Sequence, residues 1–271
     1  MTARRWAAAL PAAAVLLLAL AGPWLASDAT SPVAGPFAPA GRAHPLGTDV
    51  LGRDVLARVL TGGFIPVLQA LAATVLGSVA GLAVGIWAGT THRRRSARAA
   101  LHTVDAIAAV PSLLLLLLLA AGFPGDDVAV AVAIALVSTP FSVRVVRERA
   151  ASLAATDYAR EAEARGEPFR SRLRHDLLPG LAPVALAEAG IRFVAATQLA
   201  ATAGFLGLGT GAPAANWGRM VRENSVGLAA NPSPVLVPAA LLITLAVAAT
   251  MLLDRASGRT LGGPDRVGSA S

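Results

Sequence analysis

Long apolar segments, separated by loops that carry most of the arginines, constrain this chain more than any other feature. A helix needs about 20 apolar residues to cross the hydrocarbon core of a bilayer. We therefore predict an all-α polytopic membrane protein with about six transmembrane helices and a cytoplasmic loop that holds a short helix. The predicted spans are residues 6–26, 64–90, 103–121, 128–143, 183–203 and 235–253.

The composition agrees with a membrane protein and excludes several other classes. Of the 271 residues, 55% are hydrophobic and 14% are charged, whereas soluble domains carry about 25% charged residues. The chain has no cysteine, which excludes disulfides and thiolate metal sites. It also has no lysine, which excludes a phosphate-binding loop for ATP. The net charge of +7 does not indicate nucleic acid, because only 4% of the residues are aromatic and the arginines lie between apolar runs.

The arginines also predict the orientation of the chain. If the N-terminus is cytoplasmic, the inner segments hold most of the 23 basic residues, and the outer loop 122–127 holds none. Because cytoplasmic loops are enriched in basic residues, we expect both termini in the cytoplasm. Residues 1–29 also resemble a cleaved secretory signal, with a basic start and small residues after the apolar part. We favour a retained helix, because its apolar part is long and further spans follow.

Four glycines in the second predicted span recur at every fourth residue, which places them on one face of a helix. Such a stripe lets a neighbouring backbone approach closely, as tight helix packing in lipid requires. The partner is either another helix of this chain or a second subunit. We also expect Pro111 to kink the third span, because proline removes a backbone donor. The four glycines are Gly77, Gly81, Gly85 and Gly89.

Two opposite charges, Glu188 and Arg192, lie four residues apart inside the fifth predicted span, on one face of the helix. A lone charge at the centre of a bilayer costs about 2.5–3.5 kcal/mol, so we expect the two side chains to pair or to face a wet interior. A role in transport is the alternative to a purely structural pair. The 4 histidines lie in loops or at the ends of spans, so the sequence predicts neither a metal site nor an enzyme active site.

The largest predicted cytoplasmic loop, residues 144–182, contains a short helix with recognisable end signals. Asp157 can cap a helix that begins at Tyr158, and Gly166 can end it. A helix of about two turns is not stable alone, so it needs a partner. Ala162, a small residue between charged neighbours, suits insertion into a groove of a soluble protein. An ordinary solvated connection is the alternative, but the loop is longer than a connector needs.

The segment "HPLGTDVLGRDVLARVLTGG", residues 44–63, interrupts the apolar sequence on the predicted outer side. Its spacing predicts a surface helix over residues 48–61, capped by Thr48 or Asp49. Such a helix lies flat at the interface and either closes the outer mouth or supports a binding protein; a plain connecting helix is the alternative. Charges four residues apart stabilise it, and an apolar stripe covers one face. The charge pairs are Asp49–Arg53 and Asp54–Arg58, the stripe is Leu51, Val55 and Val59, and Gly62 and Gly63 end the helix.

The cytoplasmic loop resembles the "EAA" loop of bacterial ABC-importer permeases, in which a coupling helix docks on a separate ATPase subunit. In that family the Glu-Ala-Ala triplet precedes a glycine at a fixed distance, which here is Gly166. The triplet position holds an arginine first and a glutamate second, so the glutamate is displaced by one residue. The resemblance implies that this loop couples transport to ATP hydrolysis. The residues that carry it are Tyr158, Arg160, Glu161, Ala162, Gly166, Leu178 and Pro179.

Two further blocks resemble the second permease subunit of the dipeptide, oligopeptide and nickel importers. One is "HPLGTD" with the following "GRD" in the outer segment, and the other is "GFLGLGTGAPAANWGRM", residues 204–220. The chain departs from the family at Ala200, where a glutamate is frequent. Within the second block, "GLGTGA" superficially fits a dinucleotide fingerprint, but no strand precedes it. The matching residues of the first block are Gly47, Thr48, Asp49, Gly52, Arg53 and Asp54.

The resemblance implies a permease subunit in the bacterial cell membrane that imports short peptides, with nickel as the lesser option. Residues 64–271 would form the permease transmembrane domain, and residues 1–63 would hold the first helix and the outer-surface helix. The implied partners are a second permease subunit in a heterodimer, two ATP-binding subunits and an extracytoplasmic substrate-binding protein. Those partners bind the ATP, so we expect no cofactor in this chain and no enzymatic activity of its own.

A stand-alone membrane protein, either a gradient-driven carrier or an intramembrane enzyme, is the alternative function. A carrier typically shows inverted repeats and charges at mid-membrane, and we find no repeat in the sequence. An enzyme needs a constellation of histidine, aspartate or serine at membrane depth, and the histidines do not provide one. The sequence therefore favours the importer subunit.

Overall fold

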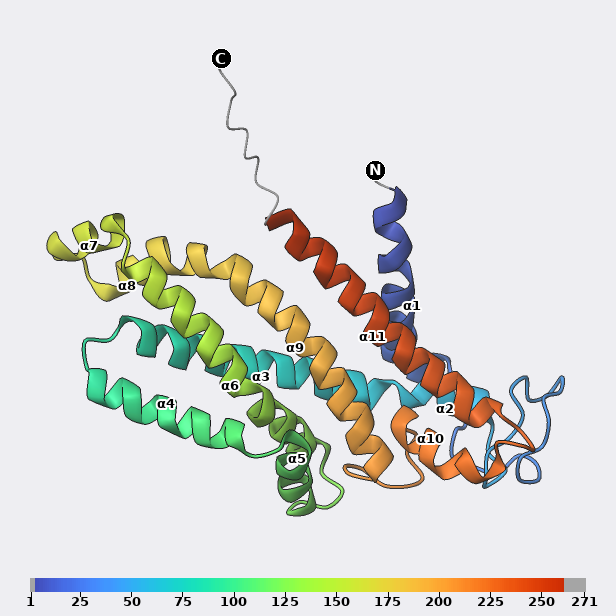
Figure 1. The fold of residues 1–271 in the computed structure, drawn as a ribbon. Coiled ribbons are helices and arrows are strands. Elements are labelled where there is room, and N and C mark those ends of the chain that lie inside the picture. The colour runs from blue at the N-terminus through green and yellow to red at the C-terminus, as the bar shows by residue number, and fades with distance from the viewer. Residues whose placement is uncertain (1–2, 261–271) are drawn as a thin grey trace.

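The apolar segments form long helices that cross one another in an elongated bundle (Figure 1). A computed structural model describes the backbone of residues 3–260 and the side chains of residues 10–251. Residues 261–271 of the predicted permease domain lie outside the described residues. The elements are α1 (Ala3–Leu25), α2 (Val55–Gly62), α3 (Phe64–Thr90), α4 (Arg94–Ala109), α5 (Ser112–Ala121), α6 (Asp127–Ala154), α7 (Asp157–Ala164), α8 (Phe169–Arg172), η1 (Leu173–Leu177), α9 (Leu178–Leu206), α10 (Trp217–Asn224), η2 (Ser225–Gly227) and α11 (Ser233–Thr260).

Five of the six predicted spans lie within a single helix to within one residue, although only some of these helices have the length of a full crossing. In the described part of the chain, four continuous stretches are long and apolar enough to cross a membrane, and the pair α4 and α5 supplies a fifth if both halves form one span. The described apolar part of α1, Leu10–Leu25, is shorter than these stretches. The four long stretches are Val55–Thr90, Asp127–Ala154, Phe169–Leu206 and Ser233–Met251.

The prediction of one continuous helix over residues 103–121 is wrong. The chain bends by 90° between α4 and α5, at Val110 and Pro111. Proline disfavours the helical conformation of the preceding residue, and Val110 has an extended ψ of 129°. The kink expected at Pro111 is thus a sharp break. Beyond it, Leu116 and Ala120 anchor α5 in the central core beside α6.

The centre of the bundle is formed by α3, α6 and α9, which pack along one another (Figure 1). Three of the four glycines of α3 face α6, the fourth, Gly77, lies against Arg192 of α9, and all four leave little room for side chains. A Cβ atom built on Gly85 would lie 2.8 Å from Cβ of Val146, and one on Gly89 would lie 2.7 Å from the carbonyl oxygen of Arg147. A Cβ on Gly81 would collide with Ser142. The stripe therefore packs against a helix of the same chain, the first of the two partners considered from sequence.

The N-terminal segment packs onto the C-terminal helices. Val15 and Ala19 of α1 join Val55 of α2, Trp217 of α10 and Leu245 of α11 in one buried apolar cluster. This cluster lies at the end of the bundle opposite α7 (Figure 1). The first 63 residues therefore share a core with the remainder of the chain.

Candidate functional site

The loop that the sequence predicts to be cytoplasmic contains the expected short helix, with its start shifted by one residue. Thr156, rather than Asp157, is the N-cap, and its hydroxyl oxygen accepts a hydrogen bond from the Ala159 N–H at 3.4 Å. At the other end Gly166 has a φ of +74°, the left-handed conformation that glycine adopts most readily. The N–H of Glu167 donates to the carbonyl of Ala162 at 3.1 Å, which closes the last turn.

The exposed and buried faces of α7 differ from the sequence prediction. Ala162 is 0% exposed and Ala159 is also buried, because both face the chain itself. The prediction that Ala162 inserts into a groove of another protein is therefore wrong. Tyr158 is 62% exposed, and Arg160 and Glu161 are exposed as well. Any partner on this side meets these three side chains, while small residues hold α7 against its own subunit.

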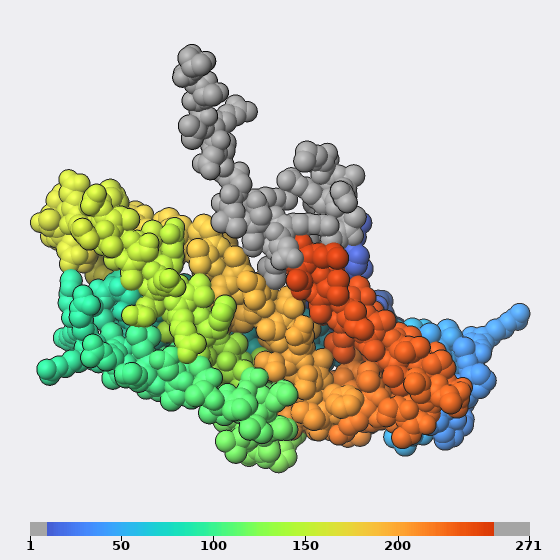
Figure 2. Space-filling view, viewed as in Figure 1, coloured from blue at the N-terminus to red at the C-terminus, as the bar shows by residue number. Residues whose placement is uncertain are grey.

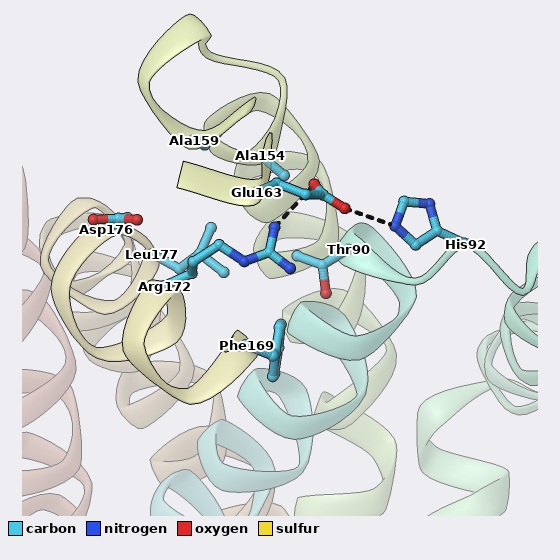
Figure 3. Close-up of a pocket in the computed structure, with 9 residues that line it drawn as sticks. All are labelled: Thr90, His92, Ala154, Ala159, Glu163, Phe169, Arg172, Asp176 and Leu177. Atoms are coloured by element: carbon cyan, nitrogen blue, oxygen red, sulfur yellow. Dashed lines mark hydrogen bonds and ion pairs between the residues drawn. The ribbon is translucent and has the colours of Figure 1, made fainter. Parts of the chain in front are cut away.

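Glu163 on the inner side of α7 joins three elements (Figure 3). Its carboxylate lies 2.9 Å from the Arg172 guanidinium on α8 and 3.1 Å from Nε2 of His92 in the loop after α3. The hydrogen bonds of His92 and Arg172 to this carboxylate hold the pKa of Glu163 below its ordinary value. The three side chains line a cavity of about 40 Å³, with Thr90 and Phe169 among its other walls. Glu163 therefore links α7 to α8 and to the loop after α3.

Sequence reasoning missed this cluster. Its members lie on three elements that are distant in the chain, and no fixed spacing along one helix connects them. Near Gly166, Arg165 pairs with Glu167 at 2.9 Å, and that hydrogen bond raises the pKa of Arg165. Leu178 and Pro179 lie exposed at the start of α9, directly after the π-helical turn η1. The loop thus continues without a break into a long helix of the bundle.

The outer segment does not form the predicted helix over residues 48–61. The helix α2 begins at Val55, and Asp54 is its cap, accepting from the N–H of Leu56 at 2.9 Å. Thr48 and Asp49 belong to a buried loop instead. Thr48 donates its hydroxyl to the carbonyl of Gly35 at 2.6 Å, so it is bonded across the loop and caps no helix. The competing tertiary hydrogen bonds explain why the helix starts later than predicted.

The charges of the outer segment form one buried cluster. Arg53 pairs with Asp49 at 2.8 Å, as the spacing predicts, although both lie outside a helix. The predicted Asp54–Arg58 pair is not formed, because Arg58 turns to Asp49 at 3.2 Å and to Glu223 of α10 at 3.3 Å. Two arginines thus share two carboxylates, one of which lies on a distant helix. Each charge is compensated where water is excluded.

Two glycines of the outer segment have the left-handed backbone conformation. Gly47 and Gly52 have φ values of +70° and +74°. A Cβ on Gly47 would collide with the carbonyl of Ala38, and one on Gly52 with that of Ala34. The segment folds back onto itself at these two turns, and both positions therefore accept glycine but no residue with a Cβ atom.

The structure brings the two outer sequence blocks together. Trp217 donates its indole N–H to the carbonyl of Val59 at 2.7 Å, and Asn224 accepts from the N–H of Val50 at 2.9 Å. Asn216 caps α10, as its position predicts. The turn in "GLGTGA" is held by Asp127 at the start of α6, which accepts from the Thr210 N–H at 3.1 Å. These contacts give the glycine-rich segment a structural role at the outer end.

The predicted pair in the fifth span is formed. Glu188 and Arg192 are each 4% exposed and make an ion pair on α9. Ser142 of α6 donates its hydroxyl to Glu188 at 3.1 Å, and the Arg192 guanidinium lies against Gly77 of α3. The network therefore connects the three central helices. It borders a groove of about 510 Å³ whose polar lining also includes Ser112, Ser138, Gln198 and Thr202.

Known proteins with the same sequence pattern identify the class to which this fold belongs. Residues 81–261 match the family described as binding-protein-dependent transport system inner membrane component, and the chain belongs to this family. The probable D,D-dipeptide transport system permease protein DdpC of Escherichia coli is 31% identical over 209 residues, covering 76% of this chain and 70% of the relative. The dipeptide transport system permease protein DppC of Alkalihalophilus pseudofirmus is 32% identical over 254 residues, covering 88% and 79%.

The fold has solved counterparts. The methionine ABC transporter MetNI in an inward-facing conformation contains a chain that matches with a TM-score of 0.60 and 20% identity, over 77% of this chain and 97% of that one. The protein is thus a multi-pass inner-membrane permease subunit of an ABC importer. Such a subunit works with ATP-binding subunits and a partner membrane subunit. The family consists of components of binding-protein-dependent transport systems, which argues against both stand-alone alternatives, the gradient-driven carrier and the intramembrane enzyme.

Proposed function

We propose that this permease imports short peptides and is driven by two separate ATP-binding subunits, one of which docks on α7. The relatives that are named as dipeptide and D,D-dipeptide permeases support the substrate class. The chain has no lysine for a phosphate-binding loop, which supports ATP binding by other subunits. Nickel is the lesser alternative for the cargo.

The single observation that carries the coupling role is the two-sided construction of α7. One face is buried through Ala159 and Ala162, and the other presents Tyr158, Arg160 and Glu161 to a partner. Tyrosine and arginine are the residue types that dominate the binding free energy of protein interfaces. A short helix that is anchored on one side and exposed on the other can transmit a push from the partner to the bundle.

The path of that push follows the chain on both sides of α7. The C-terminal end of α6 at Ala154 leads directly into α7. The pair of Glu163 and Arg172 then connects α7 to α8, from which η1 and α9 continue. Closure of the ATP-binding subunits would therefore move α6 and α9 together. Because these helices pack on α3, the motion shifts the balance between inward-open and outward-open states.

The remaining partners are proposed from the surface and from the orientation. Large apolar side chains of α3, among them Val75 and Val79, are exposed, and lipid together with a different permease subunit would cover them. The arginine distribution supports cytoplasmic termini and therefore a cytoplasmic α7. On the opposite side, the ordered cap around Asp49 and Glu223 offers a stable outer surface on which a substrate-binding protein can dock.

The docking role is tested by co-purification of the ATP-binding subunits with the permease and by peptide uptake into proteoliposomes. In Tyr158→Ala and Arg160→Ala, each lost contact should cost about 1–2 kcal/mol, or about 5–30-fold in affinity. Arg170→Ala, at an exposed position of α8, is the matched control and should co-purify normally. Normal co-purification and uptake by the Tyr158→Ala/Arg160→Ala double variant would overturn the docking role.

The cargo is tested separately, on the cognate substrate-binding protein. A thermal-shift screen against dipeptides, longer peptides and nickel should show stabilisation by peptides, because binding to the native state raises the melting temperature. Stabilisation by nickel alone would replace the peptide assignment and leave the coupling role of α7 intact.

A further inference from the structure

A second cavity lies where the cytoplasmic end of α3 meets α4 and α6. It has a volume of about 340 Å³. In Figure 2 the surfaces of α4 and α6 run beside each other toward the end of the molecule that carries α7. The coupling contacts described above do not use this cavity, because its lining shares no residue with the cavity around Glu163.

The polar side of this cavity is cationic. Arg94 and Arg98 on the first turns of α4 line it together with Arg147 of α6, and no carboxylate belongs to its lining. Among the described residues, these three arginines form no ion pair, whereas neighbouring Arg144 is paired with Asp105 at 2.7 Å. No side chain caps the N-terminus of α4, and the helix begins at Arg94, one of these three arginines. Three positive charges and a helix N-terminus therefore converge without a compensating anion.

The other side of the cavity is apolar. Its apolar side chains are those of Ala88, Ala97, Leu101 and Ala151, and Gly89 and Thr91 complete the lining. The neighbouring surface of α3 carries exposed Trp87, a residue type that is enriched where a membrane meets water. The cavity thus lies at the boundary between the apolar surface of the spans and the arginine-rich segment 91–98, which includes the start of α4. Its shape and chemistry fit an amphiphile with a negatively charged head.

We propose that this cavity binds the phosphate headgroup of an anionic phospholipid. Arginine forks match phosphate oxygens in two parallel hydrogen bonds, and basic pockets between membrane helices on the cytoplasmic side bind such headgroups. The acyl chains would lie along the apolar surface below Leu101 and Trp87. The lipid would fill the space between α4 and α6 and hold α4 in position next to the coupling loop. Free inorganic phosphate offers the same head chemistry without the apolar part.

The test uses the complete transporter in nanodiscs that contain either phosphatidylcholine alone or a mixture with phosphatidylglycerol. Native mass spectrometry measures the lipids retained after release from the disc. We expect phosphatidylglycerol to be retained preferentially, and each of Arg94→Gln, Arg98→Gln and Arg147→Gln to weaken retention about fivefold. The triple Arg→Lys variant keeps the charge but loses the two-bond fork, so it should retain less phosphatidylglycerol than the wild type and more than the triple Gln variant.

Arg95→Gln is the matched control, because it lies on the same turn of α4 but does not line the cavity. Equal retention of phosphatidylglycerol by the triple Gln variant and by Arg95→Gln would overturn the proposal. It would also be overturned if excess inorganic phosphate displaced the lipid completely, since the apolar wall would then contribute nothing. Loss of the ATP-binding subunits from the triple Gln variant with unchanged lipid retention would assign the cavity to a protein contact instead.

Discussion

Glu163 and Arg172, which lie 2.9 Å apart, join α7 to α8 across the turn at Gly166. The same carboxylate reaches His92 after α3, so the ends of the central helices meet at one side chain. This arrangement joins α7 to its own subunit, so a partner can reach it only through its exposed face.

The ion pair of Glu163 and Arg172 predicts that α7 becomes less ordered at acidic pH. The pKa of Glu163 is lowered in the folded protein, so its stabilising contribution is complete above the ordinary value of 4.5 and is lost as the pH falls below that value. Protection of the α7 amides against hydrogen exchange, corrected for the pH dependence of intrinsic exchange, should therefore fall only below this range. Glu163→Ala should exchange fast already at neutral pH, and a wild-type profile for that variant would contradict the role of the pair.

Substitution of Ala162 tests how α7 packs against its own subunit, separately from its docking on a partner. Because this side chain is fully buried, Ala162→Arg should push α7 away from the bundle, a steric and desolvation penalty of about 1–3 kcal/mol. Peptide uptake should fall while the protein still inserts into the membrane. Ala164→Arg, at an exposed position of the same helix, is the control for added charge. Equal uptake by both variants would contradict the buried packing.

The glycine stripe predicts a strict size limit at the contact of α3 and α6. Gly85→Leu should destabilise the protein by about 1–3 kcal/mol or more, because its Cβ meets Val146 at 2.8 Å. The melting temperature in detergent, followed by tryptophan fluorescence, measures this loss. Gly35→Ala, where a Cβ meets nothing within 4 Å, should melt as the wild type does.

The buried ion-pair cluster around Asp49 predicts that losing one of its carboxylates destabilises the protein more than losing a carboxylate at the surface. Asp49→Asn leaves Arg53 and Arg58 buried with reduced compensation, which typically costs about 3–5 kcal/mol. Asp105→Asn breaks the exposed pair with Arg144 and should cost about 0–1 kcal/mol. Thermal unfolding of both variants gives the comparison. Similar melting temperatures would show that water reaches the cluster.

The network at Glu188 predicts that its two charges compensate each other. Removing one, in Glu188→Gln or Arg192→Gln, leaves a buried charge and should reduce the amount of folded protein in the membrane. The double variant removes both charges and should recover most of that loss. Peptide uptake by the recovered double variant then decides between structure and transport: normal uptake indicates a structural pair, and low uptake indicates a pathway role beside the groove.

The sequence alone determined the features that depend on local chemistry. Apolar length defined where helices lie, and the end signals placed a short helix before Gly166 within one residue of its observed start. The spacing of Glu188 and Arg192 was enough to predict their pair, because residues four apart meet on any helix. The break at Pro111 was foreseen as a kink, but its 90° angle depends on how α5 packs against α6.

Tertiary structure decided what depends on partners from distant parts of the chain. Arg58 has Asp54 four residues before it, yet it bonds to Asp49 and Glu223, because a buried arginine needs carboxylates that reach it in three dimensions. Ala162 looked like a docking residue but faces inward, since small side chains suit close packing on either side of a helix. The three arginines that line the cavity between α4 and α6, Arg94, Arg98 and Arg147, converge only when α4 folds back beside α6. Folding, rather than spacing, brings such groups together.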